Sequence, residues 1–508
     1  MNSLNATPTA PHVRPQSSTR KGMSLVVLRG LVILFGLLVY AILATDVITN
    51  LQGLAAYTLL LLWYLYAEVK NLWVRDTYLF WINPVVLASI FTFVLTFGVS
   101  NVLFFMPEDE VALVGVQPNV TFWMNQLMLL VLLGAVSMWV GYSSGIGLGM
   151  GRMLQRSREM RKWMKISGRI NMPVVYFCLV TSLIARLLAI KLGVYGYSSS
   201  YDQLIAAASY TEYLSMAGLL GKLALLCVAL QCFDLSRTVH LDVQRLWLVL
   251  GIEVVFGFLS GFKSAVVMPF VIVGIVYYTQ RNRFPLWLIP SVVIAIMVAY
   301  AVIEPFRVAR NENAGFVGTS IGSIVSTITS AGSLNANDDG ERASTAVNFL
   351  ARSNLTYVAS LGIEYAANNE LPAGSPDFVG DIILAPAYAF IPRFLWEGKS
   401  LQNSGLWYTN QIMGFDIMSS TAYSPFTYLN FSGGPLAVIL GFLTVGIIQR
   451  GLFDGLRRFG GGGLIVLLGL LGSLTNIDSA FSSFFVGILR FLPIMVVLQY
   501  ALLKRLRR

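Results

Sequence analysis

Apolar residues run through this chain in long, nearly uninterrupted stretches that short polar segments separate. The hydrocarbon core of a bilayer is about 30 Å thick, so a helix needs about 20 apolar residues to cross it. Stretches of about this length predict an all-α polytopic membrane protein with about twelve transmembrane helices. The expected spans are 24–46, 48–67, 78–105, 122–150, 170–193, 213–233, 246–261, 264–279, 285–303, 433–449, 461–476 and 480–502.

The composition excludes a set of separate soluble domains. Hydrophobic residues make up 56% of the 508 residues and charged residues only 12%, and the mean hydropathy is +0.69. A soluble chain has about 25% charged residues, so this chain lacks the charge needed to cover several water-soluble cores. Residues 1–22 differ, because they are rich in Ser, Thr and Pro, and we expect them to form a disordered cytoplasmic tail.

Membrane topology explains the net charge of +10 better than a nucleic-acid partner does. Lys and Arg are enriched in the cytoplasmic loops of membrane proteins. With the N-terminus placed in the cytoplasm, most of the 35 Lys and Arg residues fall in cytoplasmic segments, including the basic run from Arg152 to Arg169. The short external loop around Asp109 is acidic. We therefore expect both termini to be cytoplasmic and no nucleic acid to bind.

One connecting segment is too long to be a simple loop. Residues 304–432 follow the ninth expected span on the external side, and long loops are usually functional. Apolar residues at helical spacing over 347–361 predict an amphipathic helix at the membrane surface. Residues 378–396 are apolar but interrupted by one aspartate and two prolines, which favours a re-entrant or interfacial segment over a span. The expected divisions of the chain are 1–22, 23–303, 304–432 and 433–508.

Basic residues in the long loop are candidates for binding phosphate groups. Arg393 and Lys399 flank Trp396 directly after the apolar segment. In a partly dehydrated external cavity such groups suit a phosphate or diphosphate through charge-assisted hydrogen bonds. The alternative for the arginines and lysine of the loop is ion pairing with the acidic residues of the same loop. A further lysine lies in the turn between the seventh and eighth expected spans, and its alternative is snorkelling from a helix end. The other basic candidates are Arg307, Arg310, Arg352 and that lysine, Lys263.

Charged side chains inside the expected spans need a partner or a function, because charge within a bilayer is costly. Arg186 and Lys222 are close enough to the span ends to snorkel. Arg490 is mid-span, with Asp478 as its candidate partner. These residues alone therefore leave a structural and a functional interpretation open.

The residue inventory argues against metal and thiol chemistry. The three cysteines form no CxxC pair and fall in or beside apolar spans, which is typical of small core residues. With only two histidines, a histidine-based metal site or a Ser-His-Asp triad is nearly excluded, and we expect no metal. The glycine series at 145–151 lacks the GxGxxG spacing, and we expect it to loosen the end of the fourth span.

Aromatic and acidic residues of the external segment are candidates for contact with sugars. Trp396, Tyr423 and Tyr428 carry rings that can stack on sugar rings, although Trp and Tyr are also common at membrane interfaces. Glu364 and Asp381 are candidate general bases, and the alternative for each is a solvated carboxylate.

Several sequence elements then occur in a recognisable order. They are Asn348-Phe349-Leu350-x-Arg352, a segment from Gly380 that ends in Phe390-Ile391-Pro392-Arg393, Trp396-x-Gly398-Lys399, and Tyr428-Leu429-Asn430-Phe431 leading into a span. In this order, and with the turn Ser260–Ser264, the chain resembles the Wzy-type polymerases of O-antigen and exopolysaccharide repeat units. The layout of twelve spans with one large, structured, late periplasmic loop also resembles that family, which implies a GT-C-like fold.

The resemblance implies an inverting, metal-independent glycosyltransferase of the bacterial inner membrane that needs no cofactor. It would transfer a growing glycan from undecaprenyl diphosphate onto the next lipid-linked oligosaccharide at the periplasmic face, among membrane lipids and with a chain-length regulator protein as a further partner. Fixed cations would stabilise the charge of the leaving diphosphate. The implied diphosphate contacts are Arg352, Arg393, Lys399, Lys263, Arg307 and Arg310; the implied catalytic residues are Glu364, Asp381 and Arg393; the implied sugar contacts are Trp396, Tyr423, Tyr428 and Asn430.

Two positions depart from the pattern of the family. Thr427 stands where the family often has a Glu, so another residue must act as the base if that Glu does so elsewhere. Lys263 replaces the usual Arg, which keeps the charge but loses the planar fork. The related O-antigen ligases use a periplasmic His, whereas His12 and His240 are expected in the cytoplasm.

The rival hypothesis is a flippase for lipid-linked oligosaccharides, since such transporters also tend to have about twelve spans. Transporters usually show internal repeats and binding sites on broken helices near the bilayer midplane. The sequence shows neither clearly, which favours the enzyme.

Overall fold

The computed structural model is built almost entirely of helices. Among the residues that it describes, the only extended segments are the two-residue strands β1 (Arg169–Ile170) and β2 (Leu503–Lys504). The described residues are 24–77, 79–112, 119–164, 169–196, 208–234, 240–281, 345–372, 374–391, 395–396, 399, 404–415, 420–477 and 480–504, with scattered residues between 283 and 297.

Eight helices in the described part of the chain are long and apolar enough to cross a membrane. A helix satisfies its backbone hydrogen bonds internally, which lets it span a bilayer. This confirms the prediction of an all-α, multi-pass membrane protein. The eight are Leu25–Leu43 (α1), Pro84–Phe105 (α3, η2 and η3 together), Phe122–Ser143 (α5), Met172–Lys191 (α8), Tyr213–Cys232 (within α10), Ser264–Arg281 (within α12), Pro425–Arg457 (α20) and Phe481–Leu502 (α22).

Three further expected spans coincide with helices that are more polar or shorter. They are α2 (Asn50–Arg75), α11 (His240–Leu259) and α21 (Gly460–Thr475). The ninth expected span, 285–303, lies mostly outside the described residues. The count of twelve therefore stays a prediction.

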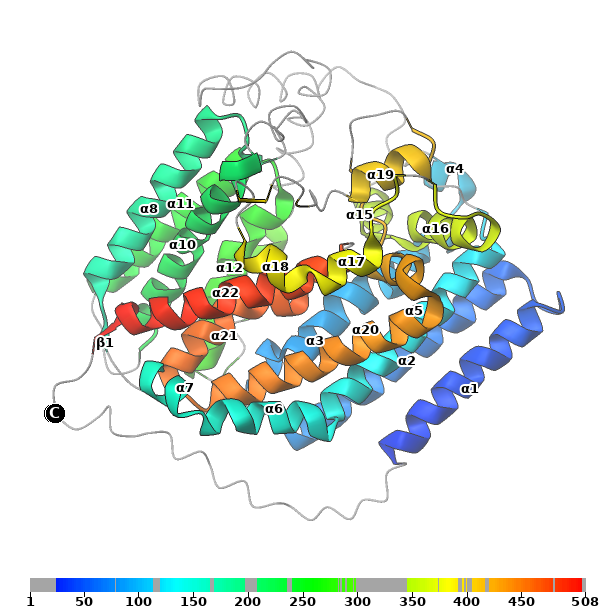
Figure 1. The fold of residues 1–508 in the computed structure, drawn as a ribbon, viewed down its shortest axis with the longest axis horizontal. Coiled ribbons are helices and arrows are strands. Elements are labelled where there is room, and N and C mark those ends of the chain that lie inside the picture. The colour runs from blue at the N-terminus through cyan, green and yellow to red at the C-terminus, as the bar shows by residue number, and fades with distance from the viewer. Residues whose placement is uncertain are drawn as a thin grey trace. The chain divides into compact units, whose positions relative to one another are not determined.

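The chain divides into two compact units. Unit 1 comprises residues 1–28 and 170–338, and unit 2 comprises residues 29–169 and 339–508. In unit 1, α10 packs along α8, and α11 packs along α12 (Figure 1). The full bounds of these two helices are α10 (Ala208–Cys232) and α12 (Lys263–Arg281).

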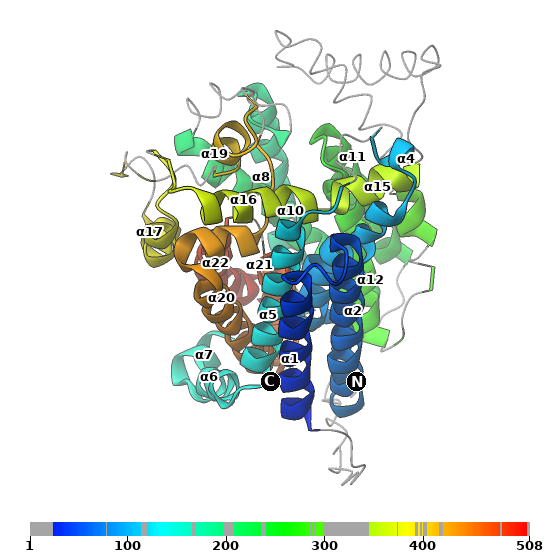
Figure 2. The ribbon, with the colours of Figure 1, turned by 90° about the vertical axis from the view of Figure 1, so that its right-hand side faces the viewer.

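Unit 2 is organised around α20, which packs lengthwise against α5 and α6 (Figures 1 and 2). The first part of this unit (29–169) and the last part (339–508) therefore pack against each other along α20. Its shorter elements are η1 (Phe80–Ile82), α3 (Pro84–Ala88), η2 (Ser89–Gly98), η3 (Val99–Phe105), α4 (Glu108–Ala112), α6 (Gly145–Arg156), α7 (Arg158–Trp163), α15 (Thr345–Ser353), α16 (Thr356–Asn368), α17 (Phe378–Ile383), α18 (Ala385–Phe390) and α19 (Ser404–Gln411).

The crossing of α5 and α20 is a backbone-to-backbone contact. A Cβ added at Gly446 would overlap the carbonyl oxygen of Met138, and one added at Gly141 would overlap the carbonyl oxygen of Leu443. Small residues that let helix backbones approach closely are typical of interfaces between membrane helices. The absence of a side chain at these two glycines therefore sets the distance between α5 and α20.

The glycine series at 145–151 forms the start of α6 and has a related role. A Cβ at Gly147 would lie 2.9 Å from the Arg450 Cβ, and one at Gly151 would lie 3.2 Å from the Gly451 carbonyl oxygen. Rather than loosening the end of the fourth span, these two glycines allow α6 to lie against α20.

Replacing Gly446 by alanine is expected to lower the free energy of unfolding by about 1–3 kcal/mol, towards the upper end because backbone atoms must move. Equilibrium unfolding of the full chain in mixed micelles measures the change. Gly149→Ala is the control, because a Cβ at Gly149 has nothing within 4 Å, and alanine is a better helix former than glycine. Equal losses in the two variants would contradict the close helix crossing.

The amphipathic helix expected over 347–361 is broken into α15 and α16 at Asn354. The Asn354 side-chain amide donates to Ser100 Oγ (3.3 Å) and Asn101 Oδ1 (2.9 Å), and its own oxygen accepts from the Thr356 backbone N–H (2.9 Å). Thr356 Oγ1 also donates to Asn101 Oδ1 at 2.6 Å. A side-chain bond to the local backbone competes with helix continuation. The same buried network ties this segment to η3.

The tenth expected span, 433–449, belongs to a longer helix that begins upstream of it. Gly433 and Gly434 have non-helical backbone angles inside α20, with a φ of +65° at Gly434. Pro435 follows and has no N–H to donate within the helix. The Tyr428–Phe431 motif therefore occupies a short helical segment in front of a break in α20.

Candidate functional site

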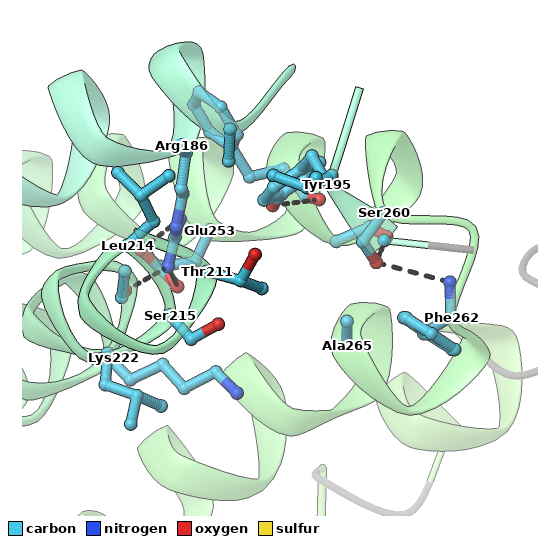
Figure 3. Close-up of a pocket in the computed structure, with 17 residues that line it drawn as sticks. Arg186, Tyr195, Thr211, Leu214, Ser215, Lys222, Glu253, Ser260, Phe262 and Ala265 are labelled. Atoms are coloured by element: carbon cyan, nitrogen blue, oxygen red, sulfur yellow. Dashed lines mark hydrogen bonds and ion pairs between the residues drawn. The ribbon is translucent and has the colours of Figure 1, made fainter. Parts of the chain in front are cut away.

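Unit 1 contains a cavity of about 310 Å³ at the end of the bundle where α8 and α11 finish and α10 and α12 begin. This volume is in the range of small-molecule pockets. Of the lining residues that the structure describes, three carry a charge, and they come from three helices: Arg186 of α8, Lys222 of α10 and Glu253 of α11 (Figure 3). The turn between α11 and α12 contributes Ser260 and Phe262 to the lining.

Arg186 and Glu253 form a buried bidentate ion pair. The Arg186 Nη1 and Nη2 atoms donate to Glu253 Oε1 (2.8 Å) and Oε2 (2.9 Å), and the two side chains are 7% and 2% exposed. Nη2 also donates to the Gly218 carbonyl oxygen at 2.8 Å, and the guanidinium carbon lies 5.2 Å from the centre of the Phe256 ring. Of the alternatives left open for Arg186, snorkelling or pairing within the unit, the structure shows pairing with a carboxylate.

The ion pair depends on the close approach of α10. A Cβ at Gly221 would overlap Glu253 Oε1 and would lie 2.7 Å from Ser182 Oγ and 3.0 Å from Arg186 Nη2. Ser182 Oγ in turn donates to the Gly218 carbonyl oxygen at 2.9 Å. The small residues of α10 therefore bring its backbone into hydrogen-bonding contact with the charged pair.

The loop after α8 and the turn after α11 meet beside the cavity. The Tyr195 hydroxyl donates to the Phe256 carbonyl oxygen at 2.9 Å. Burial raises the pKa of Tyr195 to about 12, although Arg186 opposes the shift, so the hydroxyl keeps its proton at neutral pH. Gly196 has a φ of +74°, and a Cβ there would overlap the Ser260 carbonyl oxygen. This wall of the cavity is therefore fixed by both side-chain and backbone contacts.

Lys222 belongs to a polar face on the otherwise apolar helix α10. Thr211, Ser215, Gly218 and Lys222 are spaced so that they share one side of the helix, and all four line the cavity. In Figure 3 the hydroxyls of Thr211 and Ser215 and the ammonium group of Lys222 project from this side. The amine has no hydrogen-bond or ion-pair partner among the described residues, in contrast to the guanidinium of Arg186.

Lys263, which the sequence assigns to diphosphate binding, is the first residue of α12. Phe262 and Ala265, on either side of it in the chain, both line the cavity. The backbone of Lys263 is therefore at the edge of the cavity, and its contact with a diphosphate stays a prediction.

In unit 2, the segment expected to be re-entrant forms α17 and α18 in place of one span. Asp381 is 5% exposed and accepts a hydrogen bond from the Tyr388 hydroxyl at 3.1 Å. Burial raises the pKa of the Asp381 carboxyl, the Tyr388 hydrogen bond opposes this, and nearby Asp377 adds to it. Burial and the neighbouring carboxylate also raise the pKa of Tyr388 to about 12, so this group remains a donor at neutral pH.

Two basic side chains donate hydrogen bonds to backbone carbonyl groups at the C-terminal end of α18. Arg490 of α22 donates from Nη2 to the Tyr388 carbonyl oxygen (2.9 Å) and from Nε to the Ala389 carbonyl oxygen (3.3 Å). Lys399 is 6% exposed, and its Nζ donates to the Ile391 carbonyl oxygen at 3.1 Å. The mid-span arginine thus satisfies the carbonyl end of α18, and Asp478, its expected partner, lies outside the described residues.

The predicted sugar contacts lie in different surroundings. Trp396 packs on Tyr388 with ring centres 5.2 Å apart. Tyr423 is fully buried and stacks on Tyr408 at 4.4 Å, and Tyr428 is 1% exposed with its hydroxyl donating to the Phe378 carbonyl oxygen at 3.3 Å. Asn430 is half-buried on the segment before the break in α20. The two tyrosines therefore have packing roles in this structure, and their sugar contacts stay predictions.

The remaining predicted residues are only partly placed. Arg352 is exposed in the last turn of α15, and Glu364 is half-buried on α16. Within the described residues, no group of three or more His, Cys, Asp and Glu side chains is arranged to hold a metal ion. Arg307, Arg310 and Arg393 lie outside the described residues.

Sequence reasoning missed Glu253, although a signal for it was present. Glu253 is an acid inside an expected span, as Arg186 is a base inside another. Two opposite charges buried in apolar helices are most easily tolerated as a pair. The polar spacing along α10 was a second signal, and it points to the same cavity.

Comparisons with known proteins identify the family of this chain but do not indicate an activity. No curated protein and no solved structure matches the chain. Residues 169–489 match the family described as "Domain of unknown function (DUF8712)". The match covers more than half of the chain, including the charged cavity and the Asp381 segment. The chain therefore belongs to the DUF8712 family.

Proposed function

We propose that this protein is a membrane glycosyltransferase that polymerises undecaprenyl-diphosphate-linked oligosaccharide repeat units at the periplasmic face of the bacterial inner membrane. The observation that carries the proposal is the charged cavity of unit 1, which borders the turn at Ser260–Ser264. That turn is one of the elements that resemble the Wzy-type polymerases. A lipid diphosphate suits such a cavity because its anionic head accepts charge-assisted hydrogen bonds and its tail is compatible with apolar helices.

The proposed reaction is a displacement at the anomeric carbon of the donor sugar. The acceptor hydroxyl oxygen forms a bond to this carbon while the bond to the diphosphate oxygen breaks, and the electron pair leaves with the diphosphate. Fixed cations stabilise the leaving charge, and a carboxylate accepts the hydroxyl proton. Attack from the side opposite the leaving group inverts the anomeric centre.

Asp381 is the better supported of the two candidate bases. It is buried, its carboxyl has a raised pKa, and the Tyr388 hydroxyl holds it in place. A base works best when its pKa lies near the working pH, and a raised pKa brings the Asp381 carboxyl closer to that pH. The proposed diphosphate contacts from the resemblance are Arg352, Arg393, Lys399, Lys263, Arg307 and Arg310.

One observation favours the rival flippase. α20 is interrupted at Gly433–Gly434 within a helix long enough to span the membrane, and transporters often place substrate sites at broken helices. Proteoliposomes that hold the purified chain and a lipid-diphosphate oligosaccharide separate the two hypotheses. A ladder of longer glycans supports the polymerase, whereas transbilayer movement without longer glycans supports the flippase.

In the same assay, Arg393→Ala is expected to lower the rate of glycan lengthening by about tenfold or more. A hydrogen bond to a charged group contributes about 1.5–3 kcal/mol, and 1.4 kcal/mol corresponds to a factor of ten. Arg281→Ala, at the exposed end of α12, is the matched control and should retain the wild-type rate. Unchanged polymer length and amount in Arg393→Ala would remove this residue from the diphosphate contacts.

A further inference from the structure

Lys222 is the feature of unit 1 that the packing of the helices leaves unexplained. It lies near the middle of the apolar stretch Tyr213–Cys232 and lines the cavity. An ionisable side chain at this depth is costly unless it is paired or serves a function. Its ammonium group has no hydrogen-bond or ion-pair partner among the described residues. The ammonium group of Lys222 therefore needs a binding partner other than the described residues.

The neighbouring charges do not neutralise it. Both oxygens of Glu253 are engaged by Arg186 at 2.8 and 2.9 Å, so the one carboxylate among the described lining residues is already matched by a cation. Within the part of the lining that the structure describes, two side chains are basic and one is acidic, which leaves one positive charge unmatched there. That surplus charge resides on Lys222, because the guanidinium of Arg186 is committed to Glu253 and to Gly218.

The surroundings of Lys222 offer neutral donors and a fixed frame. Ser215 and Thr211 project their hydroxyls from the same face of α10 (Figure 3). The ion pair behind them is held by contacts that a Cβ at Gly221 would block. Cations and hydroxyls fixed around a cavity are a typical set for anionic oxygen ligands, since an anion can gain charge-assisted hydrogen bonds without reorganising the site.

We propose that Lys222 is the anion-binding residue of the unit 1 cavity and that it binds the phosphate groups of a diphosphate. The Arg186–Glu253 pair acts as a positioning pair that keeps α10 in place. The preference for a diphosphate rests on the proposed function, whereas the requirement for an anion follows from the unmatched charge. The headgroup of a lipid diphosphate and free pyrophosphate share this chemistry.

The test measures binding to the purified full chain in detergent, with no oligosaccharide present. The probes are farnesyl diphosphate, inorganic pyrophosphate and farnesol, which separate the lipid-linked anion, the free anion and the tail. Lys222→Met is expected to weaken farnesyl diphosphate binding by about tenfold to a hundredfold, because it removes a hydrogen bond between charged groups. Lys222→Arg should restore most of the affinity, and farnesol binding should not change.

Lys191→Met is the matched control, because it removes the same charge from an exposed lysine at the end of α8 in the same unit. It should bind like the wild type. If Lys222→Met is not recovered as a folded chain, Lys222→Gln keeps an amide donor without the charge and must weaken binding in the same direction. Competition by pyrophosphate supports the free anion as ligand, and its failure supports the lipid headgroup.

Wild-type affinity in both neutral variants, or no binding of either anion to the wild type, overturns the proposal. Because this experiment measures ligand binding, it can give a positive result even if the chain does not polymerise glycans. A chain that binds the diphosphate through Lys222 but lengthens no glycan would disprove the proposed function and leave this inference standing.

Discussion

Exchanging Glu253 for glutamine is expected to lower the free energy of unfolding by about 3–5 kcal/mol, the cost of removing one partner from a buried ion pair. The carboxylate is 2% exposed and accepts both terminal nitrogens of Arg186. After the substitution the guanidinium remains buried without a counter-charge. Equilibrium unfolding of the full chain in mixed micelles measures the loss.

Two further variants show whether the loss comes from the unpaired charge. Glu159→Gln makes the same exchange in the exposed pair between Glu159 and Lys162, whose side chains are 69% and 68% exposed, and should have little effect. Arg186→Met combined with Glu253→Leu removes both charges and should recover much of the stability, because apolar replacements of a whole buried pair are often neutral. A double variant as unstable as Glu253→Gln would show that packing, and not charge, is the cause.

The helices were predictable from the sequence because a bilayer imposes a simple rule on chain length and polarity. The stretch expected over 170–193, for example, is largely apolar, with Arg186 and Lys191 as its charged residues, and forms α8 over Met172–Lys191. The rule fails where a local bond overrides it. Asn354 divides one expected helix into two because its side chain bonds to Asn101 and to the backbone of Thr356. Such a partner lies far away in the sequence, and no periodicity reveals it.

The candidate site was less predictable for the same reason. Whether Arg186 snorkels or pairs depends on Glu253, which is on another helix and can be chosen only when the helices are placed together. The residues of α10 carried a readable pattern, since Ser215 and Lys222 share a face of an apolar helix. A pattern on one helix indicates that a polar surface exists, and the packing of unit 1 turns that surface into a cavity wall.

Asparagine at Asp381 is expected to lower the rate of glycan lengthening by about a hundredfold or more, since a general base contributes roughly 10²–10⁴-fold. A base must be deprotonated to act, so the wild-type rate should rise with pH as the carboxyl loses its proton. Burial raises the pKa of this carboxyl. The rise should therefore occur at a higher pH than the value of about 3.9 for an ordinary aspartate. Rates of the purified chain over a series of pH values give both quantities.

The Tyr388 hydroxyl provides a direct check on the assignment, because its hydrogen bond lowers the pKa of Asp381 and so opposes the effect of burial. Tyr388→Phe removes that bond, which should move the rise in rate to a still higher pH while the plateau stays close to the wild-type rate. Asp377→Asn should have the opposite effect, because Asp377 adds to the raised pKa of Asp381 and loss of its charge should move the rise in rate to a lower pH. Asparagine can keep the cap that the exposed Asp377 side chain makes to the Gly380 N–H at 2.8 Å. If Asp381→Asn keeps the wild-type rate while Glu364→Gln loses it, the proton is taken by the carboxylate of α16, and the buried pair of α17 and α18 has a structural role alone.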